Sequence, residues 1–289
     1  MNMTRSLNYL LSMLLLLLCA ADASAQLVAA KEGPVVYGHH HINTTDIDAQ
    51  KKFFVDTLGG TVTKVGANLE IVKFPNVLVF FRSVKTPPGG TRGTTANHIG
   101  FSVPNLRATV DKVKASGYQM ITRTEATPDR TVIDDIAGPP PAGGSSIAFV
   151  LGPDDLKVEL VEAKQQTTPI ALHHVHFFSP SNMEMQAWYV KTFGATSRLG
   201  GAFPAAILPG VALNFSASPT PVVGTQGRAL DHVGFEVKNL EAFTKKLEAE
   251  GIKLSVPYRQ VPALGIAIAF FTDPWGTYIE LTEGLDKVQ

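Results

Sequence analysis

The sequence predicts an α+β protein of four βαβββ units, paired into two homologous halves that each form a curled mixed-sheet domain. Residues 96–103, Ala-Asn-His-Ile-Gly-Phe-Ser-Val, recur 134 positions later as residues 230–237, Leu-Asp-His-Val-Gly-Phe-Glu-Val. Another histidine-bearing strand precedes each copy by 58 or 59 residues, and a Val-Glu-Leu or Ile-Glu-Leu strand follows it. Self-similarity at a fixed offset is the mark of an internal repeat.

Length and composition fit two globular domains that bind a small molecule. The chain has 289 residues, of which 45% are hydrophobic and 8% aromatic, enough for each half to bury a core. Lysine and arginine together number 25, as do aspartate and glutamate. With no net charge, no long-range field favours nucleic acid or an acidic membrane surface. The expected partner is a small-molecule substrate, and a homodimer is also compatible with the sequence.

Residues 1–25 are typical of a secretory signal peptide. Arg5 precedes an apolar stretch, Leu10–Cys19, and Ala23-Ser24-Ala25 supplies a small-residue cleavage site. The apolar stretch is too short for an ordinary membrane span, although a retained N-terminal anchor is the alternative. We therefore expect a secreted or periplasmic protein with no membrane contact after cleavage. The mature chain has no cysteine, so a metal site would use histidine, aspartate or glutamate.

The first unit is expected to begin with a strand over Val36–Asn43. Alternation places His39, His41 and Asn43 on one face and His40 and Ile42 on the other. A helix that starts at Asp46 and ends at Gly59-Gly60 precedes three strands, divided by glycine and proline breaks: Thr61–Val65, Leu69–Phe74 and Val77–Arg82.

The second unit repeats this order of one strand, one helix and three strands: His98–Val103, Leu106–Ser116, Tyr118–Arg123, Ser146–Leu151 and Leu156–Ala163. After a polar linker, Gln165–Pro169, the pattern restarts at an offset of 135 residues: Leu172–Phe177, Met183–Thr192, Phe203–Leu208, Val211–Ser216, the His232 strand, Leu240–Glu250 and strands up to Glu283. The predicted domains are residues 35–165 and 170–285.

The halves differ in length at one loop. From the second histidine to the glutamate is 61 residues in the first half and 48 in the second. The surplus falls in Thr127–Ser145, which is rich in proline and glycine. This segment is either a lid over a cavity or a tolerated surface loop.

These motifs, and the closing segment Asp273-Pro-Trp-Gly-Thr-Tyr-Ile-Glu-Leu, resemble the vicinal oxygen chelate superfamily. That family includes glyoxalase I, fosfomycin-resistance transferases, bleomycin-binding proteins and extradiol dioxygenases, and the resemblance covers residues 35–285. It implies a sheet curled into a cup, with a divalent metal on the inner wall that chelates two neighbouring oxygens of a substrate.

The resemblance also implies a 2-His-1-carboxylate ligand set in each half: His174, His232 and Glu280, and His39, His98 and Glu159. Such a set leaves coordination positions open and a net positive ion, which polarises a bound oxygen. The cofactor would be a divalent ion, with Fe²⁺, Mn²⁺, Zn²⁺ and Ni²⁺ all compatible.

The grouping of these ligands has two alternatives. We favour a site within the second half, His174, His232 and Glu280, because its closing turn Asp273–Gly276 is intact. In the first half Asp155 replaces the turn glycine, which demands a positive φ or another turn. That half would hold a second site, which is either functional or degenerate. The alternative groups His39 with His232 and Glu280 across the halves.

Departures from the family leave the reaction open. The fourth ligand and base of glyoxalase I corresponds to Phe80 and Asn214. A phenylalanine can neither ligate a metal nor accept a proton, and an amide is a poor base. The tyrosine of the dioxygenases corresponds to Phe149 and Phe270. Oxygen-dependent cleavage and lyase or isomerase chemistry through an enolate remain, and a metal-independent binding protein of the bleomycin-resistance type is the alternative function. By strand parity, the candidate proton-transfer residues are His41, His176, Glu236 and Tyr278, each of which could instead simply line the wall.

Overall fold

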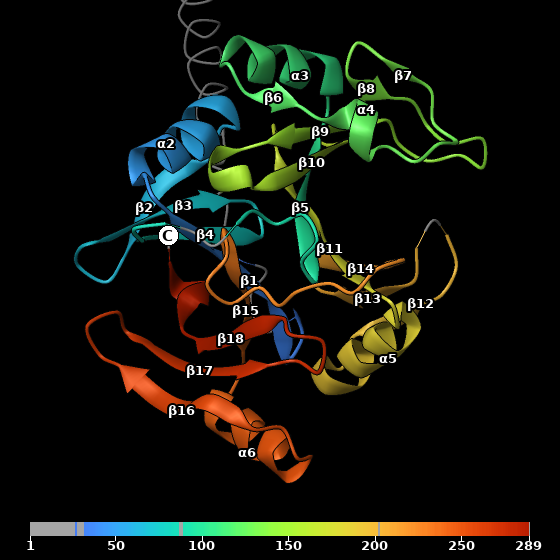
Figure 1. Cartoon of the computed structure of the whole chain (residues 1–289). Helices are drawn as coiled ribbons and strands as arrows, with labels where there is room; N and C mark the ends of the chain where they lie inside the picture. The colour runs from blue at the N-terminus through green and yellow to red at the C-terminus, as the bar shows by residue number, and fades with distance from the viewer. Residues whose placement is uncertain (1–26, 28–31, 87–88, 202, 289) are drawn as a thin grey trace, which may run out of the picture.

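The computed structural model describes residues 27, 32–86, 89–201 and 203–288. Its two large curled sheets and flanking helices confirm the predicted α+β class (Figure 1). The predicted signal peptide, residues 1–25, lies outside the described residues. Within the described part of the chain, no helix has both the length and the apolar character needed to cross a bilayer.

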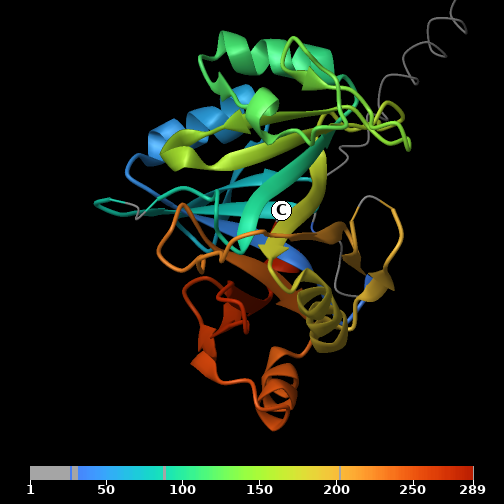
Figure 2. The same cartoon turned by 45° about the vertical axis from the view of Figure 1, so that its right-hand side comes forward.

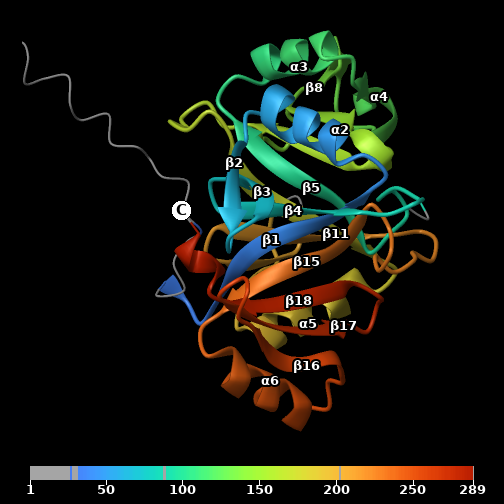
Figure 3. The same ribbon diagram turned by 90° about the vertical axis from the view of Figure 1, so that its left-hand side faces the viewer.

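Sheet 1 has eight strands and joins the first unit to the last, in the order β16-β17-β18-β15-β1-β4-β3-β2. β1 and β15 pair antiparallel at its centre, while β4 and β18 pair parallel with β1 and β15, respectively. Figure 3 shows blue β1 and orange β15 side by side. The strand bounds are β1 Val35–Thr44, β2 Thr61–Val65, β3 Leu69–Phe74, β4 Val77–Ser83, β15 Leu230–Val237, β16 Leu254–Val261, β17 Ile266–Thr272 and β18 Tyr278–Glu283.

Sheet 2 joins the two middle units in the same way, in the order β12-β13-β14-β11-β5-β10-β9-β8-β7, with β6 paired to β9. Here β5 and β11 form the central antiparallel pair, which runs through the middle of Figure 2. The bounds are β5 Ala96–Val103, β6 Gln119–Met120, β7 Val132–Ile133, β8 Ile136–Ala137, β9 Ile147–Leu151, β10 Lys157–Glu162, β11 Ala171–Ser179, β12 Thr196–Arg198, β13 Ala205–Leu208 and β14 Val211–Ala217.

The sheets do not follow the division of the sequence into residues 35–165 and 170–285. Each sheet takes one βαβββ unit from each half. Within a unit, the first strand pairs on only one edge, for example β1 with β4, so its other edge still needs a partner. The opposite half supplies that partner, and the histidine strands of different halves therefore meet.

Polar caps start three of the helices. Asp46, Asn105 and Asn239 accept hydrogen bonds from the backbone NH groups three residues later, which would otherwise lack a partner. Among the helices of the described residues, α5 is the longest, and it ends at Gly194 in the left-handed conformation, φ 68°. The helix bounds are α2 Ile47–Lys51, continued by a π-helical turn over Lys52–Thr57, α3 Leu106–Ala115, α4 Thr122–Glu125, α5 Asn182–Phe193 and α6 Leu240–Ala249.

One continuous core draws side chains from both sheets and the helices between and around them. Phe193 of α5 stacks on Phe235 of sheet 1 with ring centroids 4.3 Å apart. Phe74 of sheet 1 contacts Phe101 of sheet 2 at 4.8 Å. Ile42 lies in this core, whereas the neighbouring histidines that alternation placed on the opposite face line a separate cavity. The predicted faces of β1 are thus confirmed.

Most predicted elements are present, but one predicted strand is largely absent and some short elements were not predicted. The strand expected at Tyr118–Arg123 is only Gln119–Met120, followed by the short helix α4. The Thr122 hydroxyl accepts a hydrogen bond from the Phe149 backbone NH at 2.9 Å, which ends the strand pairing with β9 where the chain turns into the inserted segment. The insertion carries the small β7–β8 hairpin, and β12 was not predicted.

Candidate metal centres

Two clusters of buried histidine and glutamate lie on the faces of the sheets away from the core. We name them centre 1, consisting of His39, His232 and Glu280, and centre 2, consisting of His98, Glu159 and His174, with His176 beside it. In each cluster the potential donor atoms lie within 4.8 Å of one another. All seven side chains belong to buried residues.

The favoured grouping of His174 with His232 and Glu280 is wrong. His174 lies on β11 of sheet 2, where it joins His98 and Glu159. The alternative grouping, in which His39 joins His232 and Glu280, matches centre 1. The reason is the sheet pairing, which brings the first strand of one half against the second histidine strand of the other.

Centre 1 is built around one carboxylate oxygen. Oε2 of Glu280 lies 2.8 Å from Nε2 of His39 and 2.9 Å from Nε2 of His232. The other ring nitrogen of His232, Nδ1, is 2.7 Å from a carboxylate oxygen of Asp231. Nδ1 of His39 is buried without a hydrogen-bond partner among the described residues.

Centre 2 repeats this arrangement. Oε2 of Glu159 lies 2.9 Å from Nε2 of His98 and 3.1 Å from Nε2 of His174. The two Nε2 atoms are 3.4 Å apart. Nδ1 of His98 is 3.0 Å from the side-chain oxygen of Asn97, which also accepts a hydrogen bond from the Lys157 ammonium at 3.1 Å.

His39 and His174, which we call the first-position histidines of the two halves, each lie over a glycine. The absence of a side chain on that glycine lets the imidazole approach the glutamate closely. Gly234 pairs with His39 across β15 and β1, and Gly100 pairs with His174 across β5 and β11. A Cβ atom on either glycine would overlap the imidazole of the paired histidine. The glycine of the repeated His-Ile-Gly-Phe and His-Val-Gly-Phe motifs therefore serves the histidine of the opposite half.

The hydrogen bonds around His98 show that this cluster is suited to a cation. Lys157 can only donate, so the Asn97 atom that it contacts is the amide oxygen, which can only accept. Nδ1 of His98 must then carry the proton, and neutral His98 presents a bare Nε2 to the carboxylate of Glu159 at 2.9 Å. Two acceptors at that distance repel unless a proton or a metal ion lies between them. Donors held about 2.0–2.2 Å from one tetrahedral Zn²⁺ ion lie about 3.3–3.6 Å apart. The donor atoms of His98, Glu159 and His174 lie 2.9, 3.1 and 3.4 Å apart, so small adjustments would bring them to that spacing.

The pKa values separate the two centres. Burial and, after it, the nearby Lys157 charge together lower the pKa of His98 to about 3. Burial also opposes protonation of His232, but its hydrogen bonds to Asp231 and Glu280 outweigh this and raise its pKa above the ordinary value. Burial opposes ionisation of Glu280 and Glu159 too, yet the paired histidines hold both carboxyl pKa values below the usual range.

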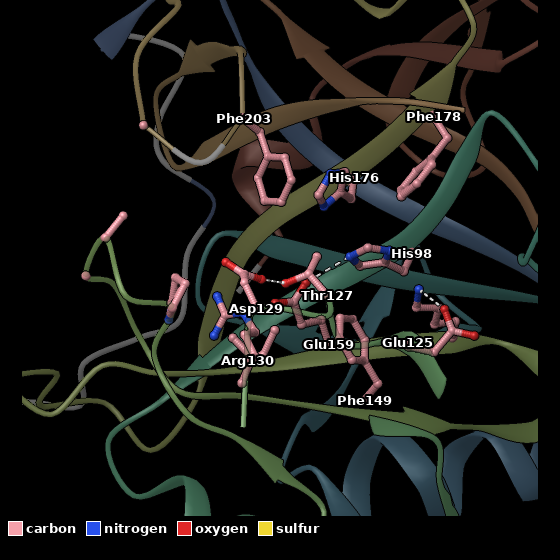
Figure 4. A pocket seen from close by; sticks show the side chains of 16 residues that line it. His98, Glu125, Thr127, Asp129, Arg130, Phe149, Glu159, His176, Phe178 and Phe203 are labelled. Carbon is pink, nitrogen blue, oxygen red and sulfur yellow. Dashed lines mark hydrogen bonds and ion pairs between the residues drawn. The ribbon is translucent and has the colours of Figure 1, made fainter. Parts of the chain in front are cut away.

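Each centre opens into a cavity of its own. The cavity at centre 1 measures about 260 Å³ and has mostly apolar walls. The cavity at centre 2 measures about 490 Å³, and Figure 4 shows His98, Glu159 and His176 in its wall with the rings of Phe178 and Phe203. Residues of the inserted segment 127–145, including Arg130, line this larger cavity. The insertion therefore forms part of the wall at centre 2 rather than a remote surface loop.

Two of the four predicted proton-transfer residues lie at the cavities. His176 lines the cavity of centre 2, and its Nε2 is 2.8 Å from the hydroxyl of Ser216. It is near enough to the donors to be grouped with them. His41 lines the cavity of centre 1 with its ring centroid 4.5 Å from that of His232, but it is not within donor range of that cluster.

The other two predicted proton-transfer residues do not fit that role. Both carboxylate oxygens of Glu236 are engaged, one by the Thr282 hydroxyl at 2.7 Å and the other by the Gly284 backbone NH, so Glu236 ties β15 to the end of β18. Tyr278 stacks on Phe270 and directs its hydroxyl to Ser255. Neither residue lines the cavities of the two centres.

The positions that depart from the family lie where the sequence placed them. Phe80 contacts the ring of His39 at 5.0 Å between centroids and lines the centre 1 cavity. Asn214 pairs with His176 across β14 and β11, and its side-chain oxygen accepts a hydrogen bond from Arg198. Neither position supplies a carboxylate.

The sequence reasoning did not identify the partners of the second histidines, Asp231, Asn97 and Lys157. The sequence did contain a signal for two of these partners, because a polar residue immediately precedes the second histidine in each repeat: Asn97 before His98 and Asp231 before His232. Polar residues at such positions orient a ligating histidine through its other ring nitrogen.

A family model agrees with this arrangement. The model of the Glyoxalase/Bleomycin resistance protein/Dioxygenase superfamily matches residues 36–139 and 130–281. The chain belongs to this superfamily. The first match lies within the first half, and the second begins inside that half and continues through the second half.

Relatives within the superfamily include two bacterial proteins that match about half of the chain. A probable lactoylglutathione lyase of Vibrio parahaemolyticus is 27% identical over 140 residues, 44% of this chain and 90% of the relative. A lactoylglutathione lyase of Haemophilus influenzae is 29% identical over 137 residues, 44% of this chain and 91% of the relative.

Two solved structures share the fold over most of the chain. Glyoxalase I from Zea mays superposes with a TM-score of 0.67 at 17% identity, over 89% of this chain and 95% of that one. A putative dioxygenase from Bacillus subtilis gives 0.59 at 11% identity, over 86% of this chain and 84% of that one. At these identities the likeness concerns the fold alone.

The close approach at Gly234 generates a test. The substitution Gly234→Ala forces the His39 imidazole away from Glu280, and overpacking of this kind lowers the free energy of unfolding by about 1–3 kcal/mol. Urea denaturation of the metal-free protein measures the change. Gly200→Ala is the control, because a Cβ at Gly200 meets open space. Equal stabilities for the two variants would contradict the packing described here.

Proposed function

We propose that the protein is a divalent-metal-dependent enzyme that acts on a small substrate chelated through neighbouring oxygens. The observation that carries this proposal is the bare Nε2 of His98, which faces the Glu159 carboxylate at 2.9 Å in a buried site. The same donor types converge at centre 1. Membership of the superfamily and the two lactoylglutathione lyase relatives support an enzymatic role.

His98, Glu159 and His174 would hold one ion, and His39, His232 and Glu280 a second. A bound divalent ion supplies Lewis acidity, which makes a proton beside a chelated oxygen easier to remove. Fe²⁺, Mn²⁺, Zn²⁺ and Ni²⁺ all accept imidazole and carboxylate ligands. The six protein donors fix the ligand set, and all of them are buried.

We place the reaction at centre 2 and assign proton transfer to His176. Burial holds the pKa of His176 well below its ordinary value, so the imidazole is neutral and able to accept a proton. Its Nε2 is held by Ser216, and its ring lies 4.6 Å from Phe203 between centroids. This arrangement favours lyase or isomerase chemistry by proton transfer. Oxygen-dependent cleavage is the competing reaction, and Phe149 stands where the dioxygenases carry a tyrosine.

The number of metal ions tests both the metal sites and their grouping. We expect elemental analysis of the purified protein to show two divalent ions per chain. Paired substitutions distinguish the groupings: His39→Ala with His232→Ala removes one ion, because both residues belong to centre 1. His39→Ala with His98→Ala removes both.

A metal content near zero in the wild-type protein, combined with tight ligand binding that survives a chelator, would instead favour the metal-independent binding function. Loss of both ions in the His39→Ala, His232→Ala variant would contradict the grouping.

The substitution His176→Gln tests the proton-transfer assignment. We expect both ions to remain and turnover of a thiohemiacetal to fall about 10²- to 10⁴-fold, the usual contribution of a positioned acid or base. Turnover is followed spectrophotometrically, with catechol cleavage assayed in parallel under air. Loss of the centre 2 ion in this variant would show that His176 is a ligand and overturn the assignment.

We further propose that the chain is exported and that residues 1–25 are removed. The charged start, the apolar stretch and Ala23-Ser24-Ala25 support this. N-terminal sequencing of the mature protein is expected to begin at Gln26. A mature protein that retains the apolar stretch would favour a membrane anchor instead.

A further inference from the structure

We propose that the two centres bind the same divalent ion with unequal affinity, centre 1 more tightly than centre 2. This inference rests on the metal sites of the proposed function. Its basis is the group behind the second histidine of each centre. Asp231, an anion, stands behind His232, whereas neutral Asn97 and cationic Lys157 stand behind His98.

At centre 1 a fixed carboxylate supports the ligating histidine. One oxygen of Asp231 is 2.7 Å from Nδ1 of His232. The other oxygen accepts hydrogen bonds from the Gly227 backbone NH at 2.6 Å and the Asn43 side chain at 2.8 Å. Arg82 lies 3.5 Å from the same oxygen, but its side chain is 57% exposed, so solvent screens its charge. The negative charge of Asp231 therefore acts largely uncancelled on the imidazole.

At centre 2 the charge behind the histidine is reversed. The Asn97 amide oxygen lies 3.0 Å from Nδ1 of His98 and accepts from Lys157 at 3.1 Å. The Lys157 side chain is only 4% exposed, and its ammonium also pairs with Glu125 at 2.6 Å. The ion pair with Glu125 offsets part of the positive charge of Lys157. Lys157 contacts both Glu125 and Asn97, and Asn97 contacts His98, so the ammonium is closer to His98 along these contacts than the Glu125 carboxylate is.

The difference affects two equivalent positions together. The residue before the second histidine is Asp231 in one repeat and Asn97 in the other, and the residue two places before the glutamate is Tyr278 or Lys157. Both Tyr278 and Lys157 pack against the phenylalanine that pairs with the glutamate across the sheet. Tyr278 stacks on Phe270 at 5.2 Å, and the Lys157 ammonium lies 4.6 Å from the ring of Phe149 at the matching place. The two repeats thus keep the same backbone positions, but the group behind the second histidine is negative in one repeat and positive in the other.

This exchange predicts the direction of the difference. A carboxylate on Nδ1 increases the electron density that Nε2 offers to a cation, and loss of such a partner weakens metal binding by about 10- to 100-fold. A buried ammonium behind the histidine acts in the opposite direction by repelling the ion. Centre 1, beside the smaller cavity of about 260 Å³, is then the tighter site, and centre 2, beside the cavity of about 490 Å³, exchanges its ion more readily.

The test uses full-length protein stripped with a chelator and titrated with Zn²⁺ against a chromophoric competitor. The variant Glu159→Ala, His98→Ala leaves only centre 1 intact, because only His174 and His176 remain of the other cluster, and Glu280→Ala, His232→Ala leaves only centre 2. We expect the centre 1 protein to bind Zn²⁺ at least 10-fold more tightly. In these backgrounds, Asp231→Asn should weaken centre 1 by about 10- to 100-fold.

Lys157→Met in the centre 2 background should bind Zn²⁺ more tightly, an outcome that damage to the fold would not produce. Lys114→Met, which removes an exposed lysine paired with Asp135, is the matched control and should leave the affinity unchanged. Equal affinities of the two single-centre proteins, or weaker binding after Lys157→Met, would overturn this inference alone. Failure of either centre to bind Zn²⁺ would contradict the proposed function itself.

Discussion

The antiparallel pairing of histidine strands from opposite halves is the constraint on which both centres depend. β1 pairs with β15 and β5 pairs with β11, so each first-position histidine lies across from a glycine of the other half. The parallel partner strands β18 and β10 then bring Glu280 and Glu159 beside those glycines. The backbone hydrogen bonds of the sheets thereby set the relative positions of the three donor residues of each centre.

Much of the fold followed from the sequence because the repeat presents each signal twice. The alternation in Val36–Asn43 placed His39 and His41 on the cavity face, and the resemblance to the superfamily implied the six donor positions. The turn at Asp155 was expected to need a positive φ or another turn, and its φ is 58°. Local pattern was sufficient here because each feature depends on a few neighbouring residues.

The grouping of the donors could not be read in the same way. Alternation says which face of a strand a side chain occupies, but not which two strand edges meet. Because the halves are homologous, pairing within a half and pairing across the halves satisfy the same local pattern. The strand expected at Tyr118–Arg123 failed for a related reason, since the contact of Thr122 with Phe149 spans 27 residues.

Duplication has preserved the donors while their surroundings have diverged. Both centres keep two histidines and a glutamate on the same scaffold, with Phe270 or Phe149 edge-on to the second histidine. The groups behind the histidines, the cavity volumes and the inserted wall segment all differ. Such divergence is consistent with a division in which only centre 2 admits the substrate, as we propose.

Anomalous X-ray diffraction from crystals loaded with Co²⁺ tests the central claim most directly. Two peaks per chain are predicted, one bounded by His39, His232 and Glu280 and the other by His98, Glu159 and His174. A peak that joins His174 to His232 and Glu280, or the absence of any peak at these six residues, would contradict it.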